Sequence, residues 1–479
     1  MIQWSARFLH HLVGRYQHAP LPSQGASAPS MPPQPARMPP EILTLIGYYL
    51  DQSSLLRLAL VCQRLRDIVI PRLLFRHVLL VNHGAIISFC HMLLALDPTA
   101  GTFVRSLDCV HRAPKLSPAN AWLIVQTLRR MTNILRVNIP IPFYEYYPDL
   151  LIVLSSFPKL RHLSLGINEA QNLSMIPRLP ELRALHVTLD SFAKISASSP
   201  LRDMSHHSPL GSVLLHSRNT LEDIKLDLAA FMPAAGSTLT FTWPSVRLLD
   251  FGSLALGRWE HLDLSVTFPA VRHFVAPLKN RATWHTRNPT FLAGLTSLEG
   301  DWKVLRAAVA AGALLQRVVG RWQWTPEVDL GVFPSTLGCL ALRVAAEDFE
   351  ALIHHVNQTP FASLKVFALT IVLDRNAECD YTSMAEKVGA VWWCADLEFI
   401  SVNFKAQRTV DKSARVQCWH GLAERLPWVR FISVRIAAET SVWETSVPGK
   451  SKEPLPSDAV AIADFYCLRR WTEPFITLH

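Results

Sequence analysis

Apolar residues recur in a short strand-like pattern through most of the chain. The consensus is L-x-x-L-x-L, and its alternation of apolar and polar positions predicts strands with one buried face. The clearest copy is Leu160 to Leu165, followed by Gly-Ile-Asn168. Related copies, most of them 22 to 39 residues apart, span 104–109, 134–139, 182–187, 221–226, 246–251, 271–276, 337–342, 364–369, 397–402 and 429–434.

A second pattern precedes five of these strands: an apolar residue, a proline, any residue, Leu or Val, and an arginine. Because proline cannot continue a helix, the pattern predicts that a crossover helix stops there and the chain enters the next strand. One strand and one helix cannot bury their apolar faces alone. The predicted fold is therefore α/β, a solenoid of stacked units with a parallel sheet, its crossovers including 121–131, 348–356 and 459–468.

Helical periodicity precedes the repeats. Proline in a first turn and a following carboxylate favour a helix opening at Pro39-Pro40-Glu41. Ile42, Leu43, Ile46 and Leu50 then share one face. A second helical stretch, with N-caps offered near Ser53, runs from Leu55 to Ile68 and is predicted to end at Pro71. A domain of only two or three short helices gains stability when its remaining apolar surface is buried against a partner or against the following domain.

The segment from Val78 to Leu96 has no charged residue among its nineteen, but polar residues interrupt it. We read it as a strand at 78–81, a turn at 82–84 and a helix at 85–96, so no membrane span is predicted. Residues 17–40 are rich in Pro, Ser, Ala and Gln and lack apolar periodicity. The predicted organisation is a disordered or partly helical lead-in at 1–37, a helical domain at 38–77 and the repeat domain at 78–479.

Three blocks of the helical segment resemble the F-box: Met38-Pro-Pro-Glu-Ile-Leu43, Leu55-Leu-Arg-Leu58 and Val61-Cys-Gln-Arg-Leu65. Met38, Gly47, Leu65 and Phe75 depart from residues common in that family. The resemblance implies docking onto the adaptor subunit of an SCF-type ubiquitin ligase and, through the adaptor, onto a cullin. The residues it implies for docking are Pro39, Ile42, Leu43, Ile46, Leu50, Leu55, Leu56, Val61, Cys62 and Leu65. Some of them must also form the unit's own core.

The repeats resemble the divergent leucine-rich repeat-like regions behind an F-box, especially in fungal orphan proteins of this type. That resemblance implies a non-catalytic substrate receptor whose repeats hold an unidentified target protein. The alternative is a repeat scaffold with no ligase role, in which the N-terminal helices only cap the solenoid.

The arginines that end the proline pattern occupy one repeat position, so we expect them to form a column along the sheet. They are candidate target-binding residues, because unpaired arginines would attract an acidic partner. The competing interpretation is that each is paired with a carboxylate or stacked on an aromatic ring. The five are Arg161, Arg183, Arg247, Arg272 and Arg430.

Composition narrows the function classes further. The net charge of +9 is spread along the chain without a run of five basic residues, which does not favour a nucleic-acid partner. The eight cysteines form no CxxC pair, so we expect no metal site. We also expect the thiols to be reduced, as in an intracellular protein of the cytoplasm or nucleus. Arg7 and Arg15 lie among apolar residues at helical spacing, which leaves a mitochondrial presequence as an alternative.

No nucleophile, metalloprotease, dinucleotide or kinase motif occurs. Pro448-Gly-Lys-Ser451 resembles the end of a P-loop, but Glu444 stands where its first glycine belongs. The sequence thus predicts no catalytic residue and no cofactor.

Overall fold

The structure is a computed structural model of the whole chain. It describes residues 2–4, 38–47, 50, 52–80, 82–109, 117–139, 148–167, 179, 181–189, 209–227, 241–251, 263–276, 283–359, 361–373, 381–389, 396–405, 412–436 and 439–444. The chain divides into two compact units, Met1–Phe241 and Thr242–His479. The helical segment at 38–77 belongs to the first unit, together with part of the segment predicted to be a single repeat domain.

The first unit combines the N-terminal helices with an open, parallel sheet. Its strands pair in chain order, each with the next along the chain. They are β1 (Ile2–Trp4), β2 (His77–Leu80), β3 (Ser106–Cys109), β4 (Arg136–Ile139), β5 (His162–Ile167), β6 (Ala184–Leu189) and β7 (Asp223–Asp227). The helices are α2 (Pro40–Gly47), α3 (Gln52–Val61), α4 (Gln63–Val69), η2 (Ile70–Leu74), α5 (His83–Ala95), η3 (Pro98–Phe103), α6 (Pro118–Arg129), α8 (Pro148–Ser155) and α10 (Pro209–His216).

The second unit repeats the strand and helix alternation. Its strands are β8 (Leu248–Asp250), β9 (His273–Val275), β10 (Ser297–Gly300), β11 (Arg317–Trp324), β12 (Cys339–Ala345), β13 (Val366–Val372), β14 (Phe399–Lys405), β15 (Phe431–Ile436) and β16 (Glu439–Glu444). Its helices are α11 (Leu264–Thr267), α12 (Trp284–Arg287), α13 (Pro289–Ala293), α14 (Trp302–Ala310), η6 (Leu330–Val332), α15 (Phe349–Gln358), α16 (Tyr381–Gly389) and α17 (Lys412–Arg425). Pairing is parallel in chain order except that β16 is antiparallel to β15.

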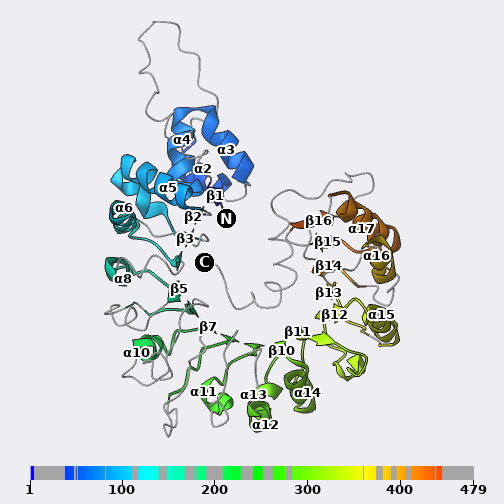
Figure 1. Cartoon of the computed structure of the whole chain (residues 1–479). Helices are drawn as coiled ribbons and strands as arrows, with labels where there is room; N and C mark the ends of the chain where they lie inside the picture. The colour runs from blue at the N-terminus through cyan, green and yellow to red at the C-terminus, as the bar shows by residue number, and fades with distance from the viewer. Residues whose placement is uncertain are drawn as a thin grey trace, which may run out of the picture. The chain divides into compact units, whose positions relative to one another are not determined.

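Helices cover one side of the strands in each unit. In the first unit, α6, α8 and α10 lie on the same side of their strands, and in the second, α15, α16 and α17 do so (Figure 1). The alternate residues that face the helices are buried, for example Leu163 and Leu165 on β5 and Ile400 and Val402 on β14. The core of each unit is thus the layer between its sheet and its helices.

The proline pattern closes a tight turn between helix and strand. The Leu160 N–H donates to the Phe157 carbonyl over 3.3 Å, and Val271 and Val429 donate in the same way to Phe268 and Leu426. In each turn proline takes the second position, where its fixed φ is favoured. The first apolar residue of the L-x-x-L-x-L pattern closes this turn, so strand pairing begins two residues later than the pattern predicts, at His162 and not at Leu160.

The predicted strand copies are confirmed with that offset. The sequence missed β16, which is antiparallel to β15, and two parallel strands, β10 and β11. Both start as the pattern requires, Leu295-Thr-Ser-Leu298 and Leu315-Gln-Arg-Val318, but Gly300 and Gly320 replace the third apolar residue. The two glycines are register partners. A Cβ atom at Gly300 would lie 3.1 Å from the Ala276 Cβ, so the neighbouring strand leaves little room for a leucine there.

Near the N-terminus the structure corrects several details. The chain stays helical beyond Pro71, as the π-helix η2, because proline lies in the first turn of that new segment, where its missing N–H is tolerated. The predicted helix at 85–96 starts at His83, since the Asn82 side chain caps it by accepting from the Ala85 N–H over 2.8 Å. Residues 2–4 form β1, whereas the lead-in was predicted to be disordered or partly helical; its other residues up to 37 lie outside the described residues.

The predicted crossovers at 121–131 and 348–356 correspond to α6 and α15, and the third, at 459–468, lies outside the described residues. Among the helices that the structure describes, none is long and apolar enough to cross a membrane.

Gly312 ends α14 in a left-handed conformation, with φ of 86°. Its N–H donates to the Val309 carbonyl over 2.9 Å, and the Ala313 N–H donates to the Ala308 carbonyl over 3.0 Å, the two bonds of a Schellman cap. We expect Gly312→Ala to lower the free energy of unfolding by about 1 kcal/mol, because a Cβ is strained at this φ.

No atom lies within 4 Å of a Cβ built at Gly312, so a steric clash would not explain that loss. The matched variant is Gly312→Asn, which adds a larger side chain but tolerates the left-handed region better. Thermal unfolding of the two variants checks the prediction, and an Asn variant less stable than the Ala variant would contradict it.

Candidate functional site

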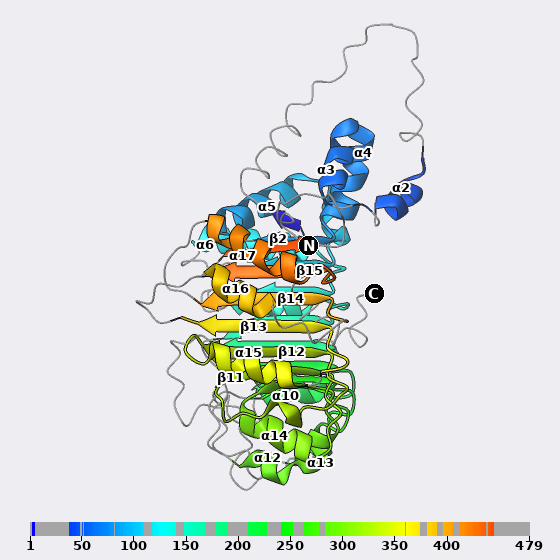
Figure 2. The same ribbon diagram turned by 90° about the vertical axis from the view of Figure 1, so that its right-hand side faces the viewer.

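The helices α2, α3 and α4 carry most of the predicted docking residues and lie next to one another (Figure 2). Helix α2 starts where the prolines predicted, because the Pro39 carbonyl accepts from the N–H groups of Ile42 and Leu43 over 3.1 and 3.2 Å. Thr44 Oγ1 donates to the Pro40 carbonyl over 2.7 Å, and Glu41 lies in the first turn. These contacts fix the first turn of α2 and therefore which of its residues point inward.

The second predicted helical stretch is broken at Cys62. Its backbone is extended, with φ of −157° and ψ of 163°, so α3 ends at Val61 and α4 starts at Gln63. Leu43, Leu65 and Ile68 form a small core, against which Met38, Leu58 and Cys62 pack. The Arg64 guanidinium donates to the Met38 carbonyl over 3.1 Å and so ties the entry of α2 to α4.

Burial separates the predicted docking residues into three groups, a division that the sequence alone could not make. Leu43, Leu55 and Leu65 are at most 7% exposed and belong to the interior. Leu56 and Cys62 are half-buried. Five residues face solvent and are free for a partner: Pro39, Ile42, Ile46, Leu50 and Val61.

Two further apolar residues are exposed here that sequence reasoning missed. Leu45 is 54% exposed on α2, and Leu60 is 57% exposed at the end of α3. Leu45 lies at i+3 from Ile42, next to Ile46, so the apolar side of α2 is wider than one predicted stripe. The signal was in the sequence, since 42–46 holds four apolar residues in five positions and a helix of this size cannot bury all of them.

Gly47, which departs from the F-box pattern, is buried at the C-terminal end of α2. A Cβ atom built there would clash with the Leu73 side chain, only 2.2 Å from its Cδ1 atom. The glycine therefore lets η2 approach α2 closely. Its cost in helix propensity is offset by a packing contact that the sequence did not show.

The helical segment is also packed against the strand and helices that follow it, β2, α5 and η3. Phe75, fully buried, meets Phe89 of α5 edge to face with ring centroids 5.8 Å apart. The Arg72 guanidinium lies 5.5 Å from the ring centroid of Phe103. The Arg76 carbonyl accepts from the N–H groups of both Arg105 and Ser106. The helical segment thus packs against the start of the parallel sheet in addition to exposing apolar residues.

The five candidate target-binding arginines lie in the turns that lead into strands, as predicted. Two pairs of these arginines occupy adjacent positions on neighbouring strands. The Arg183 N–H donates to the Arg161 carbonyl, and the Arg272 N–H donates to the Arg247 carbonyl. The column is interrupted beyond these pairs. The next position after Arg183 is Glu222, and the next after Arg272 is Thr296.

Most of these side chains have identified contacts within the protein. The guanidinium groups of Arg161 and Arg272 donate to the carbonyls of Glu181 and Gly294, in the turns that follow, over 2.9 and 2.8 Å. Arg183 lies 3.9 Å from the Glu222 carboxylate, and Arg430 lies over the Phe431 ring. Arg247 also has an interaction partner. That any of the five binds a target stays a prediction.

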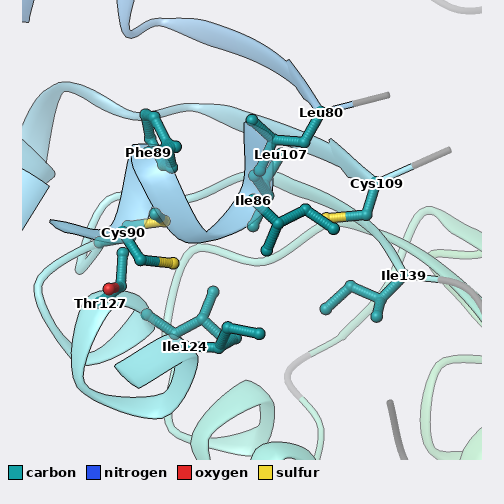
Figure 3. Close-up of a pocket in the computed structure, with 11 residues that line it drawn as sticks. Leu80, Ile86, Phe89, Cys90, Leu107, Cys109, Ile124, Thr127 and Ile139 are labelled. Carbon is teal, nitrogen blue, oxygen red and sulfur yellow. The ribbon is translucent and has the colours of Figure 1, made fainter. Parts of the chain in front are cut away.

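A small apolar cavity of about 20 Å³ lies under β2, β3 and β4 in the first unit. Figure 3 shows Cys90, Cys109 and Thr127 among apolar side chains that line it. Burial raises the pKa of the Cys90 thiol to about 12 and raises that of Cys109 as well, so both thiols stay protonated near neutral pH. A volume this small holds about one water molecule. The cavity is a packing defect of the core and not a reaction site.

One close polar pair on the sheet of the first unit was not predicted. His186 Nε2 lies 2.7 Å from Asp223 Oδ2, and Ser164 is the register neighbour of His186. Within the described residues no serine or cysteine forms a hydrogen bond with His186, so the pair lacks an oriented nucleophile. In the same part of the chain no group of three or more His, Cys, Asp or Glu residues could hold a metal ion.

Comparison with known proteins identifies one segment. Residues 35–81 match the model of the F-box-like family, which includes all three helices, η2 and β2. No curated protein matches the chain.

We expect Gly47→Ala to lower the free energy of unfolding by about 1–3 kcal/mol, although alanine is the better helix former, because its Cβ would displace the buried Leu73 side chain. Thermal unfolding of the full chain measures this loss. In a double-mutant cycle, Leu73→Ala should remove the penalty of Gly47→Ala. Additive losses, or a Gly47→Ala variant more stable than the wild type, would contradict the packing role of Gly47.

The Arg272 bond to the following turn predicts a second stability effect. We expect Arg272→Met, which keeps the aliphatic stem, to lower the free energy of unfolding by about 1 kcal/mol through loss of the bond to the Gly294 carbonyl. Arg306→Met, on the exposed side of α14, is the matched control. Equal unfolding midpoints for both variants and the wild type would show that the bond contributes nothing.

Proposed function

We propose that this protein is a substrate receptor of an SCF-type, cullin-RING ubiquitin ligase. Its F-box-like segment binds the adaptor and, through the adaptor, a cullin, while the repeats hold a target protein. Associated subunits transfer ubiquitin, so the receptor itself is not an enzyme. The observation that carries the proposal is the match of residues 35–81 to the F-box-like family, within which apolar side chains remain exposed.

The exposed apolar residues support docking at this segment. Ile42, Ile46 and Val61 are 44%, 42% and 63% exposed, so a partner that covered them would gain about half of the roughly 1.5–3 kcal/mol that full burial of such a side chain contributes. Their neighbours Leu43 and Leu65 already fill the interior, so these residues have no role in the core. Exposed apolar clusters of this kind mark protein interaction sites.

The arrangement of strands and helices supports the second half of the proposal. Parallel strands that pair in chain order, with helices on one side, are what leucine-rich repeat-like units produce when they stack. We infer a solenoid of this type behind the F-box-like segment. Its strand side, opposite the helices, is the surface offered to a target.

Such a role places the protein in the cytoplasm, the nucleus or both. The alternative of a mitochondrial presequence concerns the segment around Arg7 and Arg15, which lies outside the described residues. The proposal includes no cofactor, metal, membrane or nucleic-acid partner.

A repeat scaffold without a ligase role is the second candidate. The packing of Phe75 on Phe89 supports it, since the helical segment covers the end of the repeats as a cap would. Capping accounts for the buried residues of the segment. It gives no reason for Ile42, Leu45 and Ile46 to face solvent together.

We expect the double variant Ile42→Gln with Ile46→Gln to bind purified adaptor at least tenfold more weakly than the wild type, because it removes apolar surface that docking would bury. Titration of immobilised full-length protein with adaptor measures this. Ile152→Gln, an equally exposed apolar residue on α8, is the control that should bind as the wild type does.

Both glutamine variants should keep the melting temperature of the wild type, since they change exposed side chains. Failure of folded wild-type protein to bind the adaptor would reject the ligase role and leave the scaffold. Equal adaptor affinity of the double variant and the wild type would place the docking surface elsewhere.

A further inference from the structure

We propose that His162 and His273 form an acid-sensitive switch in the fold, with one histidine in each compact unit. Protonation of either histidine in mild acid loosens the pairing of the strand that it begins, β5 or β9. The switch acts on the repeats themselves, so it goes beyond the proposed function and does not depend on the ligase role.

The two histidines occupy the same place in the proline pattern. The segments Phe157-Pro-Lys-Leu-Arg-His162 and Phe268-Pro-Ala-Val-Arg-His273 share the order Phe, Pro, any residue, Leu or Val, Arg, His. The proline turn makes each histidine the first residue of its strand. The N–H groups of the two histidines donate to the carbonyls of Leu135 and Arg247 over 3.0 and 2.9 Å. Each histidine thus lies where strand pairing begins.

In the first unit, a positive charge lies directly opposite His162. Its register partner on β4 is Arg136. Like charges directly opposite each other on neighbouring strands are destabilising. Arg183, in the turn before β6, adds a second positive charge near the ring, and His186 of β6 is a further neighbour that can take up a proton. Protonation of His162 therefore places cations side by side across the sheet.

The carboxylates around His162 already have partners. Asp223 of β7 lies 2.7 Å from the His186 ring, and Asp108 of β3 lies 3.8 Å from Arg136. A protonated His162 would have to share a carboxylate that is already engaged. The surroundings of this half-buried ring thus favour the neutral imidazole.

In the second unit, a row of register partners leads from His273 to a buried guanidinium. His273 pairs with Ser297 of β10, and Ser297 pairs with Arg317 of β11. The Arg317 guanidinium donates to the Ser297 hydroxyl over 3.1 Å, so its positive charge lies close to the strand of His273. His273 and Arg317 are only 5% and 6% exposed. Water screens charges little at such buried positions, so a second cation is costly there.

The acidic residue next to this row is also engaged. Glu299 of β10 lies 3.5 Å from Arg317 and 2.6 Å from Arg321. On the other side of His273, the register partner on β8 is the uncharged Leu248, and Asp250 lies level with Val275. A protonated His273 thus adds a positive charge beside a carboxylate that two guanidinium groups already share.

The pKa values of the two histidines follow from this geometry. Burial, and after it the charge of Arg136 or Arg317, lowers the pKa of His162 and of His273 from 6.5 to about 4. Between these values the unfolded chain binds more protons than the folded chain. Stability is therefore unaffected above pH 6.5 and falls as the pH drops from 6.5 to about 4.

A third histidine differs from these two in exposure. Burial and then the Arg76 charge lower the pKa of His77, the first residue of β2, to about 4 as well. The His77 side chain is exposed, however, so water screens its charge and protonation costs less there.

The test is hydrogen–deuterium exchange of the full-length protein at about pH 7.5 and about pH 5, corrected for the pH dependence of the intrinsic exchange rate. We expect the protection of peptides around β5 and β9 to fall about tenfold between the two pH values, because opening frees a histidine that then binds a proton. His162→Gln should abolish the fall around β5 only, and His273→Gln the fall around β9 only.

Each glutamine variant is the control for the other, since the two histidines lie in different units. His91→Gln, at an exposed position on α5, should keep both falls. The two pH values are compared within each variant, so a general loss of stability does not imitate the effect. Arg136→Gln alters no histidine and should reduce the fall around β5, because it removes the opposing charge.

Equal protection of the wild type at both pH values would overturn the switch. A fall that persists around β5 in His162→Gln and around β9 in His273→Gln would assign the acid sensitivity to other groups and reject these two. Adaptor binding at about pH 7.5 should be the same in both histidine variants, since both histidines are neutral there. Failure of adaptor binding in the wild type would refute the ligase role and leave the exchange test unaffected.

Discussion

Each strand of this protein has one apolar side that a single strand and its helix cannot bury by themselves. Every strand–helix pair therefore depends on the neighbouring pairs. Within each of the two compact units, pairing of each strand with the next satisfies the backbone hydrogen bonds and aligns the apolar residues beneath the helices. The tight proline turns, the connecting arginines and the terminal helices all serve this requirement. The turns set where each strand begins, and bonds such as that of Arg161 hold consecutive turns together.

The same dependence explains why the N-terminal helices have two roles. The strand and helix that follow the helical segment, β2 and α5, need a cover for their apolar residues, which Phe75 and the neighbouring residues of η2 provide. A helical unit of this size buries few residues, and those it buries face either its own core or the repeats. What remains is an exposed apolar side on α2, which a partner would cover.

The candidate docking surface and the turn arginines differ in their physical chemistry. The surface on the helices is apolar and gains from removing side chains from water, so its affinity should depend weakly on salt. The turn arginines Arg161 and Arg272 donate to the following turns and so join consecutive turns, while target binding by any of the five stays a prediction.

The sequence by itself determined the α/β alternation, most strand positions and the helical segment with its F-box resemblance. These follow from local rules: the period of apolar residues, proline at helix ends, and capping. It missed β10 and β11, because glycine replaces the third apolar residue in both. Gly300 lies against Ala276 of the neighbouring segment, and Gly320 lies against the Trp322 ring of its own strand.

Only the tertiary structure decided which apolar residues of α2 are core and which are exposed, why Gly47 is required opposite Leu73, and that His162 lies opposite Arg136. Each of these depends on a contact between residues that are distant in the sequence, and local periodicity carries no information about such contacts.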